Sequence, residues 1–594
     1  MNNKTINLRI DGIAVSVPDN LTVMQAADSV GIHIPRLCYH PKLTKEGACR
    51  VCIVEVEGAK NFPVSCCTAV AEGMIVKTNT PAIREARRDI VELILDNHPR
   101  DCQICDKNES CELQELANLL SVKDFVYEGE RKRYPVDLSS EAIVRDPEKC
   151  LLCGKCVRVC SEIQGVNALS YTKRGYQSTV VPAYNMNISE SVCINCGQCT
   201  LFCPTGALME KDYVPEVMNA LSDPEKFCAV QIAPAVRVAV GEGFGLPPGA
   251  DLTYEMVTAL RMLGFKAVFD TQFSADLTII EEGHELIHRL TNKGVLPMFT
   301  SCSPGWIKYC EHFHPEFLGN LSTCKSPQQM MGALIKTYYA KKVNTDPAKI
   351  YSVSIMPCTA KKYECSRPEM YSSGYRDVDV VLTTRELIKM IKQAGIKFGE
   401  LKKGEVDSPL GESTGAAPIF GVTGGVMEAA LRTAYEVLTK KELPSVDFKA
   451  VRGLEGIKEA TVNIAGTDVN VAIVFSMANV HKLLEEIKAG KRKYHFVEVM
   501  TCPGGCIGGG GQPYPDGITE PLDYTLYNKR AEGLYSIDEK KKLRKSHENP
   551  YITKIYEEFL EKPLGHMSHK LLHTHYHKKC PEGVPTEAGE TISI

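Results

Sequence analysis

The chain lacks the features of membrane proteins and of nucleic-acid-binding proteins. Its 594 residues include one tryptophan and carry a net charge of only -4. No apolar run approaches the roughly 18 residues that a membrane-spanning helix needs. Without a basic surplus there is no positive field to attract nucleic acid. The N-terminal MNNKTINLRIDG has no apolar signal-peptide core. These absences predict a cytoplasmic protein whose partners include neither a membrane nor nucleic acid.

Nucleotide-binding motifs are missing as well. The stretch VAVGEGFGLPPG is similar to a dinucleotide-binding loop, but Leu246 stands where the third glycine of that loop belongs, and prolines follow. The sequence has no P-loop. We therefore expect that this chain does not itself bind NAD(P) or ATP.

Cysteine, in contrast, is abundant, with 25 residues in the chain. In a reducing compartment, dense cysteine indicates metal binding rather than disulfides. The apolar content of 44% and charged content of 24% are those of a globular protein. The length allows about four domains.

The first cysteine group follows a predicted β-hairpin at residues 5–17 and a short predicted helix at residues 22–30. The spacings x10, x2 and x13 predict a 2Fe–2S cluster on a β-grasp-like scaffold, with ligands Cys38, Cys49, Cys52 and Cys66. Cys67 is an alternative to Cys66, although neighbouring thiols point in different directions. A predicted helix at residues 82–95 then leads to a second group, His98, Cys102, Cys105 and Cys111. One imidazole and three thiolates hold zinc or a 4Fe–4S cluster, and the neighbouring clusters favour 4Fe–4S.

Two runs of C-x2-C-x2-C-x3-C form the strongest motif, and Pro204 follows the second run. In two-cluster ferredoxins the fourth cysteine of each run ligates the other cluster. One cube is therefore expected to bind Cys150, Cys153, Cys156 and Cys203. The other cube is expected to bind Cys193, Cys196, Cys199 and Cys160.

Beyond residue 226, short strand-like runs alternate with longer helical patterns, which predicts an α/β domain. Three separated segments there carry cysteine: TSCSPGW at residues 300–306, MPC at 356–358 and MTCPGGC at 500–506. Glycine around Cys502 and Cys506 allows a bulky ligand to approach the backbone, and thiolates suit iron–sulfur clusters.

These segments resemble the three signature segments of FeFe-hydrogenases, and the resemblance covers nearly the whole chain. It implies reversible H2 oxidation and proton reduction at an H-cluster, a 4Fe–4S cube bridged through one cysteine to a two-iron unit with CO, cyanide and azadithiolate. It implies that Cys506 is the bridging ligand and that Cys358 and Cys502 are cube ligands. It also places three side chains beside the two-iron unit: Lys361, Met356 and Met500.

The expected organisation is a multidomain α+β and α/β chain with five parts. These are a β-grasp 2Fe–2S domain at 1–80, a His/Cys3 4Fe–4S domain at 81–125, a two-4Fe–4S ferredoxin domain at 140–212, a large α/β H-cluster domain at 225–560 and a His-rich tail at 561–594. The expected cofactors are one 2Fe–2S cluster, three 4Fe–4S clusters and the H-cluster.

The first signature segment departs from the family at one position. The family has two adjacent cysteines, of which the first hands protons to the azadithiolate amine and the second ligates the cube; here these positions hold Cys302 and Ser303. Three alternatives remain open for the fourth ligand: Ser303 as an alkoxide, Cys302 shifted onto iron, or Cys324. Because iron prefers thiolate, a cysteine is favoured and Ser303 is expected to be dispensable for cluster assembly.

A proton route is also predicted. A helix over residues 276–290 would place Glu282, Glu285 and Arg289 on one face, which on its own also describes an ion-paired surface. The resemblance implies a path that runs through Cys302, Glu282, Ser322, Glu285 and Arg289.

The N-terminal modules resemble those of NAD(P)-linked complexes, which implies ferredoxin and a flavin/NAD(P)-binding subunit as partners. Two other classes remain: an iron–sulfur subunit of a respiratory-type complex, and a hydrogenase-like H2 sensor or assembly protein. In the tail, a helical spacing predicts a solvated or docking helix, with a metal site as the alternative, for His566, His569, His573 and His577. The last thiol, Cys580, cannot form another cluster alone.

Overall fold

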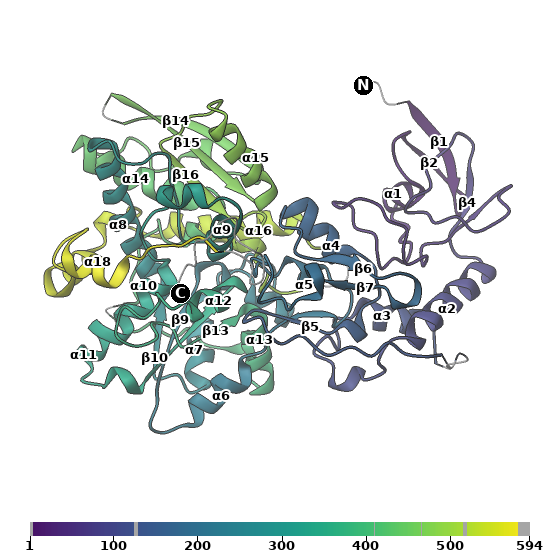
Figure 1. Ribbon diagram of the computed structural model, residues 1–594, viewed down its shortest axis with the longest axis horizontal. Helices are drawn as coiled ribbons and strands as arrows, with labels where there is room; N and C mark the ends of the chain where they lie inside the picture. The colour runs from purple at the N-terminus through teal and green to yellow at the C-terminus, as the bar shows by residue number, and fades with distance from the viewer. Residues whose placement is uncertain are drawn as a thin grey trace, which may run out of the picture.

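The structure is a computed structural model that describes residues 4–123, 127, 129–408, 410–464, 466–514 and 520–579. Its modules follow one another along the longest axis, from the N-terminal module at one end to a large α/β body at the other (Figure 1). This confirms the predicted multidomain α+β and α/β architecture. Among the helices of these residues, none has the length and apolar character to span a membrane. Cys580 lies outside the described residues.

The N-terminal module is a mixed sheet with strand order β2-β1-β4-β3. The predicted hairpin is confirmed, because β1 and β2 pair antiparallel around Gly12, whose φ of 85° suits a residue without a side chain. Strand β4 pairs in parallel with β1, and helix α1 buries Val23 and Met24 against the sheet. The elements are β1 (Thr5–Ile10), β2 (Ile13–Pro18), α1 (Val23–Asp28), β3 (Glu55–Val56) and β4 (Ile75–Lys77).

Four α-helices and two short strand pairs link this module to the α/β body. Helix α2 confirms the helix predicted over 82–95, and it begins at Pro81 because the Thr80 side chain caps the backbone of Ile83. Strands β5 and β8 pair antiparallel, as do β6 and β7. The elements are α2 (Pro81–Asp96), α3 (Glu112–Leu119), β5 (Ile143–Arg145), α4 (Lys155–Arg158), β6 (Ser170–Thr172), β7 (Thr179–Val181), α5 (Gln198–Phe202) and β8 (Leu208–Glu210).

Two four-stranded sheets form the α/β body. The first has the order β10-β9-β12-β13 and is parallel throughout, so its inner strands are buried on both faces. The second has the order β11-β16-β15-β14, in which only the edge strand β14 is antiparallel. The strands are β9 (Phe227–Ile232), β10 (Ala267–Asp270), β11 (Met298–Phe299), β12 (Ile350–Met356), β13 (Val380–Thr383), β14 (Ile457–Ile464), β15 (Thr467–Phe475) and β16 (Phe496–Met500).

Helices surround both sheets (Figure 1). The helix predicted over 276–290 is confirmed as α8, which starts earlier than predicted because the Asp270 side chain caps its N-terminus at Gln272. The helices are α6 (Val214–Ser222), α7 (Thr253–Met262), α8 (Thr271–Thr291), α9 (Pro304–Phe313), α10 (Pro327–Leu334), α11 (Ala340–Lys342), α12 (Ala360–Ser366), α13 (Thr384–Gln393), α14 (Gly425–Thr439), α15 (Met477–Lys488), α16 (Tyr524–Lys540), α17 (Pro550–Ile555) and α18 (His566–Leu572).

The predicted helical row of histidines is wrong in its second half. Helix α18 ends at Leu572, and His573 has an extended backbone with φ -115° and ψ 160°. The chain leaves the helix there because His573 forms an antiparallel bridge with Cys324. The row therefore breaks before His577.

Candidate active site

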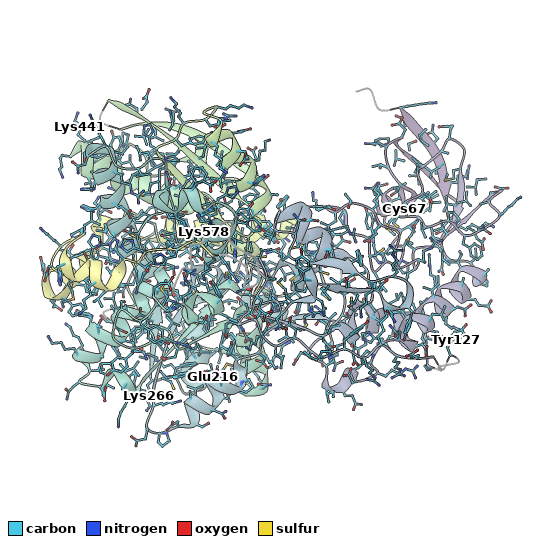
Figure 2. All side chains as sticks on the ribbon, viewed as in Figure 1. Cys67, Tyr127, Glu216, Lys266, Lys441 and Lys578 are labelled. Atoms are coloured by element: carbon cyan, nitrogen blue, oxygen red, sulfur yellow. The ribbon has the colours of Figure 1, made fainter. Side chains whose placement is uncertain are left out.

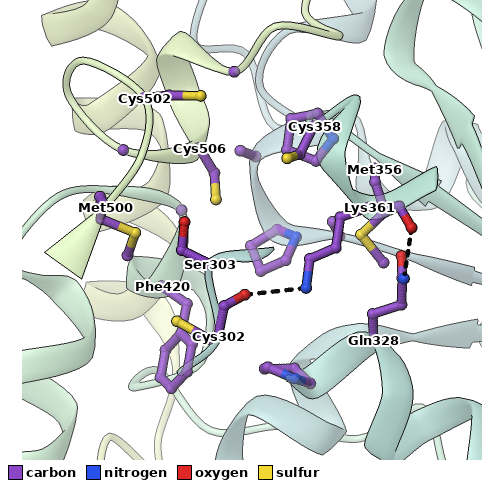
Figure 3. A pocket seen from close by; sticks show the side chains of 18 of the residues that line it. Cys302, Ser303, Gln328, Met356, Cys358, Lys361, Phe420, Met500, Cys502 and Cys506 are labelled. Carbon is purple, nitrogen blue, oxygen red and sulfur yellow. Dashed lines mark hydrogen bonds between the residues drawn. The ribbon is translucent and has the colours of Figure 1, made fainter. Parts of the chain in front are cut away.

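The three cysteine segments follow strands β11, β12 and β16, which belong to the two different sheets. They meet at the carboxyl ends of these strands, the edge where α/β sheets commonly bind ligands. A cavity opens between them (Figure 3), and its lining includes Cys302, Ser303, Cys358, Cys502 and Cys506. Three segments between residues 300 and 506 thus provide one cluster of sulfur atoms.

Glycine lets the third segment approach the second closely. A Cβ atom on Gly509 would lie 2.2 Å from the carbonyl oxygen of Pro357, and one on Gly505 would lie 2.7 Å from the backbone nitrogen of Thr423. Gly505 also has a φ of 92°, which disfavours any residue with a side chain. Gly505 and Gly509 are therefore needed to hold Cys502 and Cys506 beside Cys358.

These thiols do not ionise readily without a cation. Burial and the neighbouring Cys358 raise the pKa of Cys506 to about 12, and burial raises the pKa of Cys358 and Cys502. Thiolates are the form that binds metal, and a metal centre would offset the burial of their charge. The arrangement thus fits an iron–sulfur cluster better than it fits a set of free thiols.

Cys302 and Ser303 face different parts of the cavity. In Figure 3 the Ser303 hydroxyl lies on the side of Cys506, whereas the Cys302 sulfur lies beside Phe420. The Ser303 Oγ is 2.7 Å from Thr501 Oγ1 and accepts a hydrogen bond of 3.2 Å from the Thr501 backbone nitrogen. Burial raises the pKa of Cys302 well above its usual value, and the nearby Glu282 adds to the shift, so its thiol stays protonated.

Cys324 occupies a different environment. Its sulfur is 3.9 Å from Glu285 Oε2, and it packs in an apolar cluster with Met330 and Leu334. It is not among the described residues that line the cavity. This placement disfavours the alternative in which Cys324 supplies the missing thiolate. The Ser301 Oγ donates to the Cys324 carbonyl oxygen at 2.6 Å, and the Cys324 sulfur lies near Glu285 of α8.

Lys361, Met356 and Met500 all line the cavity, as the sequence predicted. The Lys361 Nζ donates to the carbonyl oxygen of Cys302 at 3.1 Å and to Glu364 Oε2 at 2.9 Å. Among the lining residues that sequence reasoning missed are Gln328 and Phe420. No cysteine stands next to either residue in the sequence, so no ligand spacing marked them.

Hydrogen bonds link four side chains of the predicted proton route, those of Glu282, Ser322, Glu285 and Arg289. The Ser322 side chain and the Ser301 backbone hydrogen-bond to Glu282, and the Ser322 Oγ donates to Glu285 Oε2 at 2.9 Å. Glu285 in turn accepts from Arg289 Nη2 at 2.6 Å. Burial and the neighbouring Glu285 raise the pKa of Glu282 to about 8. A carboxyl group with that pKa exchanges protons near neutral pH.

The two ferredoxin-like runs interleave as the spacing predicted. One cavity is lined by Cys150, Cys153 and Cys156 together with Cys203 of the second run. The other is lined by Cys193, Cys196 and Cys199 together with Cys160 of the first run. Burial raises the pKa of Cys150 to about 11 and of Cys160 to about 12, which again suits thiols that meet a bound metal centre.

In the N-terminal module, hydrogen bonds link the Cys66 thiol to those of Cys38 and Cys52, and Cys49 contacts Cys38. Cys67 is exposed, and Figure 2 labels it in this module. His98 is buried at the end of α2, and burial lowers its pKa to about 4, so its imidazole is neutral and able to bind metal. The three thiols that follow His98 range from partly to fully exposed: Cys102, Cys105 and Cys111.

Family models match most of the chain. The model of the iron only hydrogenase large subunit, C-terminal domain, matches residues 226–510, and that of the iron hydrogenase small subunit matches residues 524–579. The preceding matches are a 2Fe-2S iron-sulfur cluster binding domain at 3–81, the NADH-ubiquinone oxidoreductase-G iron-sulfur binding region at 87–125 and a 4Fe-4S dicluster domain at 149–207.

The chain is 50% identical over 587 residues to the NADP-reducing hydrogenase subunit HndD of Solidesulfovibrio fructosivorans, a match that covers 97% of this chain and 99% of that protein. The chain belongs to the iron-only hydrogenase family. Iron hydrogenase 1 of Clostridium pasteurianum is 41% identical, with 96% of this chain and 99% of that protein covered. An apo FeFe-hydrogenase structure from Chlamydomonas reinhardtii matches with a TM-score of 0.56 and 42% identity, over 62% of this chain and 99% of that one.

This iron-only hydrogenase is therefore an enzyme that acts on H2, as predicted. Its cavity fits the H-cluster domain of the family: three buried thiols stand on one side, and the apolar side chains of Met356, Phe420 and Met500 stand around the rest. The same chain carries 2Fe–2S and 4Fe–4S domains.

Short contacts connect the cluster sites of the hydrogenase. The Gln198 Nε2 donates to the carbonyl oxygen of Gly508 at 2.9 Å, and a Cβ on Gly510 would lie 2.2 Å from the carbonyl oxygen of Cys196. At the other end of the ferredoxin-like module, the Arg158 Nη2 donates to the carbonyl oxygens of Cys38 at 2.6 Å and Cys153 at 3.0 Å. One guanidinium thus joins the loops of two predicted clusters.

Proposed function

We propose that this hydrogenase catalyses H2 ⇌ 2H⁺ + 2e⁻ in the cavity between the three cysteine segments, with Cys302 as the proton donor and acceptor at the reacting centre. The observation that carries the proposal is the convergence of Cys358, Cys502 and Cys506 in a cavity that also holds the thiol of Cys302. When bound, the two-iron unit supplies the site where H2 is polarised. Infrared bands of iron-bound CO and cyanide in the purified enzyme would test this assignment, and protein without such bands but with full activity would contradict it.

The proposed cofactor set is one 2Fe–2S cluster, three 4Fe–4S clusters and the H-cluster. Electrons leave the active site through the Cys193 cube and then the Cys150 cube, because Gln198 and Gly510 bring the first of these against the third cysteine segment. Arg158 joins the second cube to the 2Fe–2S loop. Electrons can also pass from the Cys150 cube to the His98 site. The two sites lie close together, because a Cβ on Gly206, three residues after Cys203, would lie 2.9 Å from the Cys105 sulfur.

We propose Ser303 as the fourth protein position at the cube. Its Oγ accepts a hydrogen bond from the Thr501 backbone nitrogen, and the Thr501 hydroxyl at 2.7 Å is able to donate a second. Hydrogen bonds donated to an oxygen favour its ionised form, so they partly compensate for the weaker affinity of iron for alkoxide. This placement favours Ser303 over the cysteine that soft-ligand preference alone would select.

The proposed proton route is Cys302, Glu282, Ser322, Glu285 and Arg289. Because burial raises the pKa of Glu282 to about 8, this group is protonated at neutral pH and loses its proton as pH rises through about 8. H2 evolution, which consumes protons, is therefore expected to fall across that range. Rates of H2 evolution with a reduced dye, measured on both sides of pH 8 at saturating donor, would check this. If the pH dependence of H2 evolution were the same in Glu282→Gln, a group other than Glu282 would cause the fall near pH 8.

The proposed partners are ferredoxin and a flavin/NAD(P)-binding subunit. The similarity to an NADP-reducing hydrogenase subunit supports this, and the missing nucleotide fingerprint means that another chain has to bind NAD(P). We expect the isolated chain to reduce artificial dyes with H2 but to leave NAD(P)⁺ unreduced. Absorbance assays with each acceptor would measure this, and reduction of NAD(P)⁺ by the single chain at the dye rate would be inconsistent with it.

A further inference from the structure

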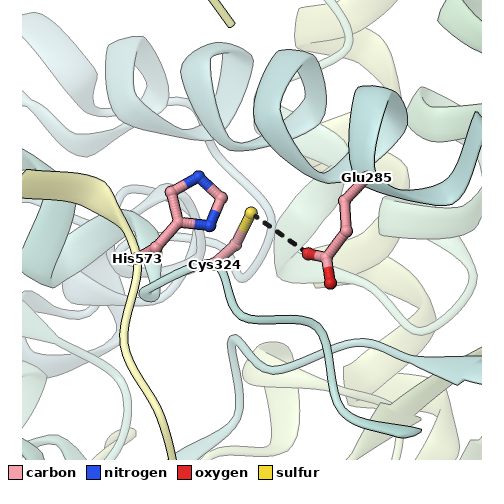
Figure 4. Close-up of side chains that lie close together, drawn as sticks. All are labelled: Glu285, Cys324 and His573. Carbon is pink, nitrogen blue, oxygen red and sulfur yellow. Dashed lines mark hydrogen bonds between the residues drawn. The ribbon is translucent and has the colours of Figure 1, made fainter. Parts of the chain in front are cut away.

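The C-terminal segment brings a histidine to the proposed proton route. His573 is 8% exposed and lies close to Cys324 and Glu285 (Figure 4). Its Nδ1 is 2.8 Å from Thr323 Oγ1, and the same oxygen is 3.3 Å from Glu285 Oε2. Thr323 thus lies between the imidazole of His573 and the carboxylate that also accepts from Ser322.

The other side of the imidazole is held by a carboxylate. His573 Nε2 is 3.1 Å from Glu281 Oε2, and Glu281 also accepts from the Tyr556 hydroxyl at 2.5 Å and the Leu564 backbone nitrogen at 2.9 Å. These hydrogen bonds and His573 lower the pKa of Glu281 despite its burial, so it stays ionised. An ionised Glu281 fixes the Nε2–H tautomer of neutral His573 and leaves the Nδ1 lone pair facing Thr323.

The His573 ring also contacts a solvent-exposed side chain, to which it can pass a proton. Exposed His569 stacks on His573 with ring centroids 4.2 Å apart. Several groups therefore face His573: Glu281 and Glu285 from α8, the Thr323 hydroxyl and Cys324 thiol from the segment before α10, His569 from α18 and, through Glu281, Tyr556. Every heteroatom of the ring has a partner suited to proton transfer.

We propose that Glu285 is a branch point, from which a second proton exit runs through Thr323 to His573 and the solvent; this rests on the proposed route through Glu282 and Ser322. In the outward direction, protonated Glu285 gives its proton to Thr323 Oγ1 while the Thr323 hydroxyl proton passes to Nδ1 of neutral His573. The products are ionised Glu285, an unchanged threonine and an imidazolium beside Glu281. The imidazolium exchanges its proton with solvent, and H2 evolution uses the same steps in reverse.

The test combines substitutions at both exits in the complete enzyme. Thr323→Val removes the hydroxyl at nearly constant shape, whereas Thr323→Ser retains it. We expect Arg289→Gln alone and Thr323→Val alone each to lower the H2 evolution rate only in part, because the other exit stays open. The double variant should lose about tenfold or more, because the two exits substitute for each other. Arg289→Gln combined with Thr323→Ser should behave like Arg289→Gln.

A second measurement separates proton transfer from a structural role of His573. In the Arg289→Gln background, His573→Ala should slow H2 evolution, and imidazole added to the buffer should restore part of the rate. His577→Ala in that background is the matched control, since His577 is exposed on the same segment beyond α18. Unchanged infrared bands of CO and cyanide would show that the site is intact in each variant.

The outcomes are distinct. Equal rates for Arg289→Gln and its double variant with Thr323→Val, or an absence of imidazole rescue in His573→Ala, would overturn the branch. Full activity of Glu282→Gln would instead overturn the proposed route on which the branch depends. Loss of rate in the Thr323→Val double variant, with recovery in Thr323→Ser, would support the branch.

Discussion

Replacing Ser303 with alanine is expected to remove the cube of the H-cluster while the other clusters stay loaded. The structure places the Ser303 hydroxyl on the side of Cys506, with hydrogen bonds from Thr501, and places Cys302 beside Phe420. Alanine would leave three protein thiolates and no fourth donor. Loading should fall by at least about tenfold, as it does when metal-site support is removed. Iron content and the infrared bands of CO and cyanide measure the result.

Ser303→Cys supplies the decisive comparison. A thiolate is the better donor for iron, so this variant should load the cube at least as well as the natural sequence. Ser301→Ala serves as the matched control, because Ser301 lies in the same segment but bonds the Cys324 carbonyl oxygen instead of facing the thiols. If Ser303→Ala keeps its iron and its infrared bands, Cys302 or solvent provides the fourth ligand, and the general preference of iron for sulfur outweighs the geometry.

Glu282→Gln is expected to reduce H2 evolution and H2 oxidation by about 100-fold or more, because it removes the only group of the proposed route between Cys302 and Ser322 that changes its protonation state. Glu282 is 2% exposed, and burial with the neighbouring Glu285 raises its pKa to about 8. Glutamine has nearly the same shape and keeps a hydrogen bond to Ser322, but it cannot release a proton. Dye-linked assays in both directions measure the loss.

The spectroscopic state of the enzyme distinguishes a blocked proton route from a damaged site. Glu282→Gln should retain its iron content and its CO and cyanide bands, since Glu282 lies on α8, outside the cysteine segments. Glu282→Asp keeps a titratable group at a longer distance and should recover part of the rate. Turnover of Glu282→Gln close to that of the natural sequence would mean that protons reach Cys302 by another path.

Much of the local structure followed from patterns in the sequence. The Asp11-Gly12 hairpin, helix α2 and the largely apolar strand β9 were all predictable, because turn chemistry, capping and apolar runs act over a few residues. The sequence predicted helix α8 but placed its start too late. Its capping residue, Asp270, lies in a run whose pattern continues the preceding strand. The histidine row failed at His573 because a tertiary bridge to Cys324 ended the helix.

The sequence by itself grouped the cysteines of the two ferredoxin-like runs. Spacing alone was enough to group Cys160 with the second ferredoxin run and Cys203 with the first, because the ligand repeat is short and rigid. It also marked Cys302, Cys358 and Cys502 as parts of one site.

Only the tertiary structure decided which side chains lie beside those cysteines and which way they point. The ends of β11, β12 and β16 bring three distant segments together, place Ser303 toward the thiols and turn Cys324 toward Glu285 and His573. A side chain's direction depends on the packing of two sheets and a C-terminal segment, and no periodicity in the chain encodes those long-range contacts.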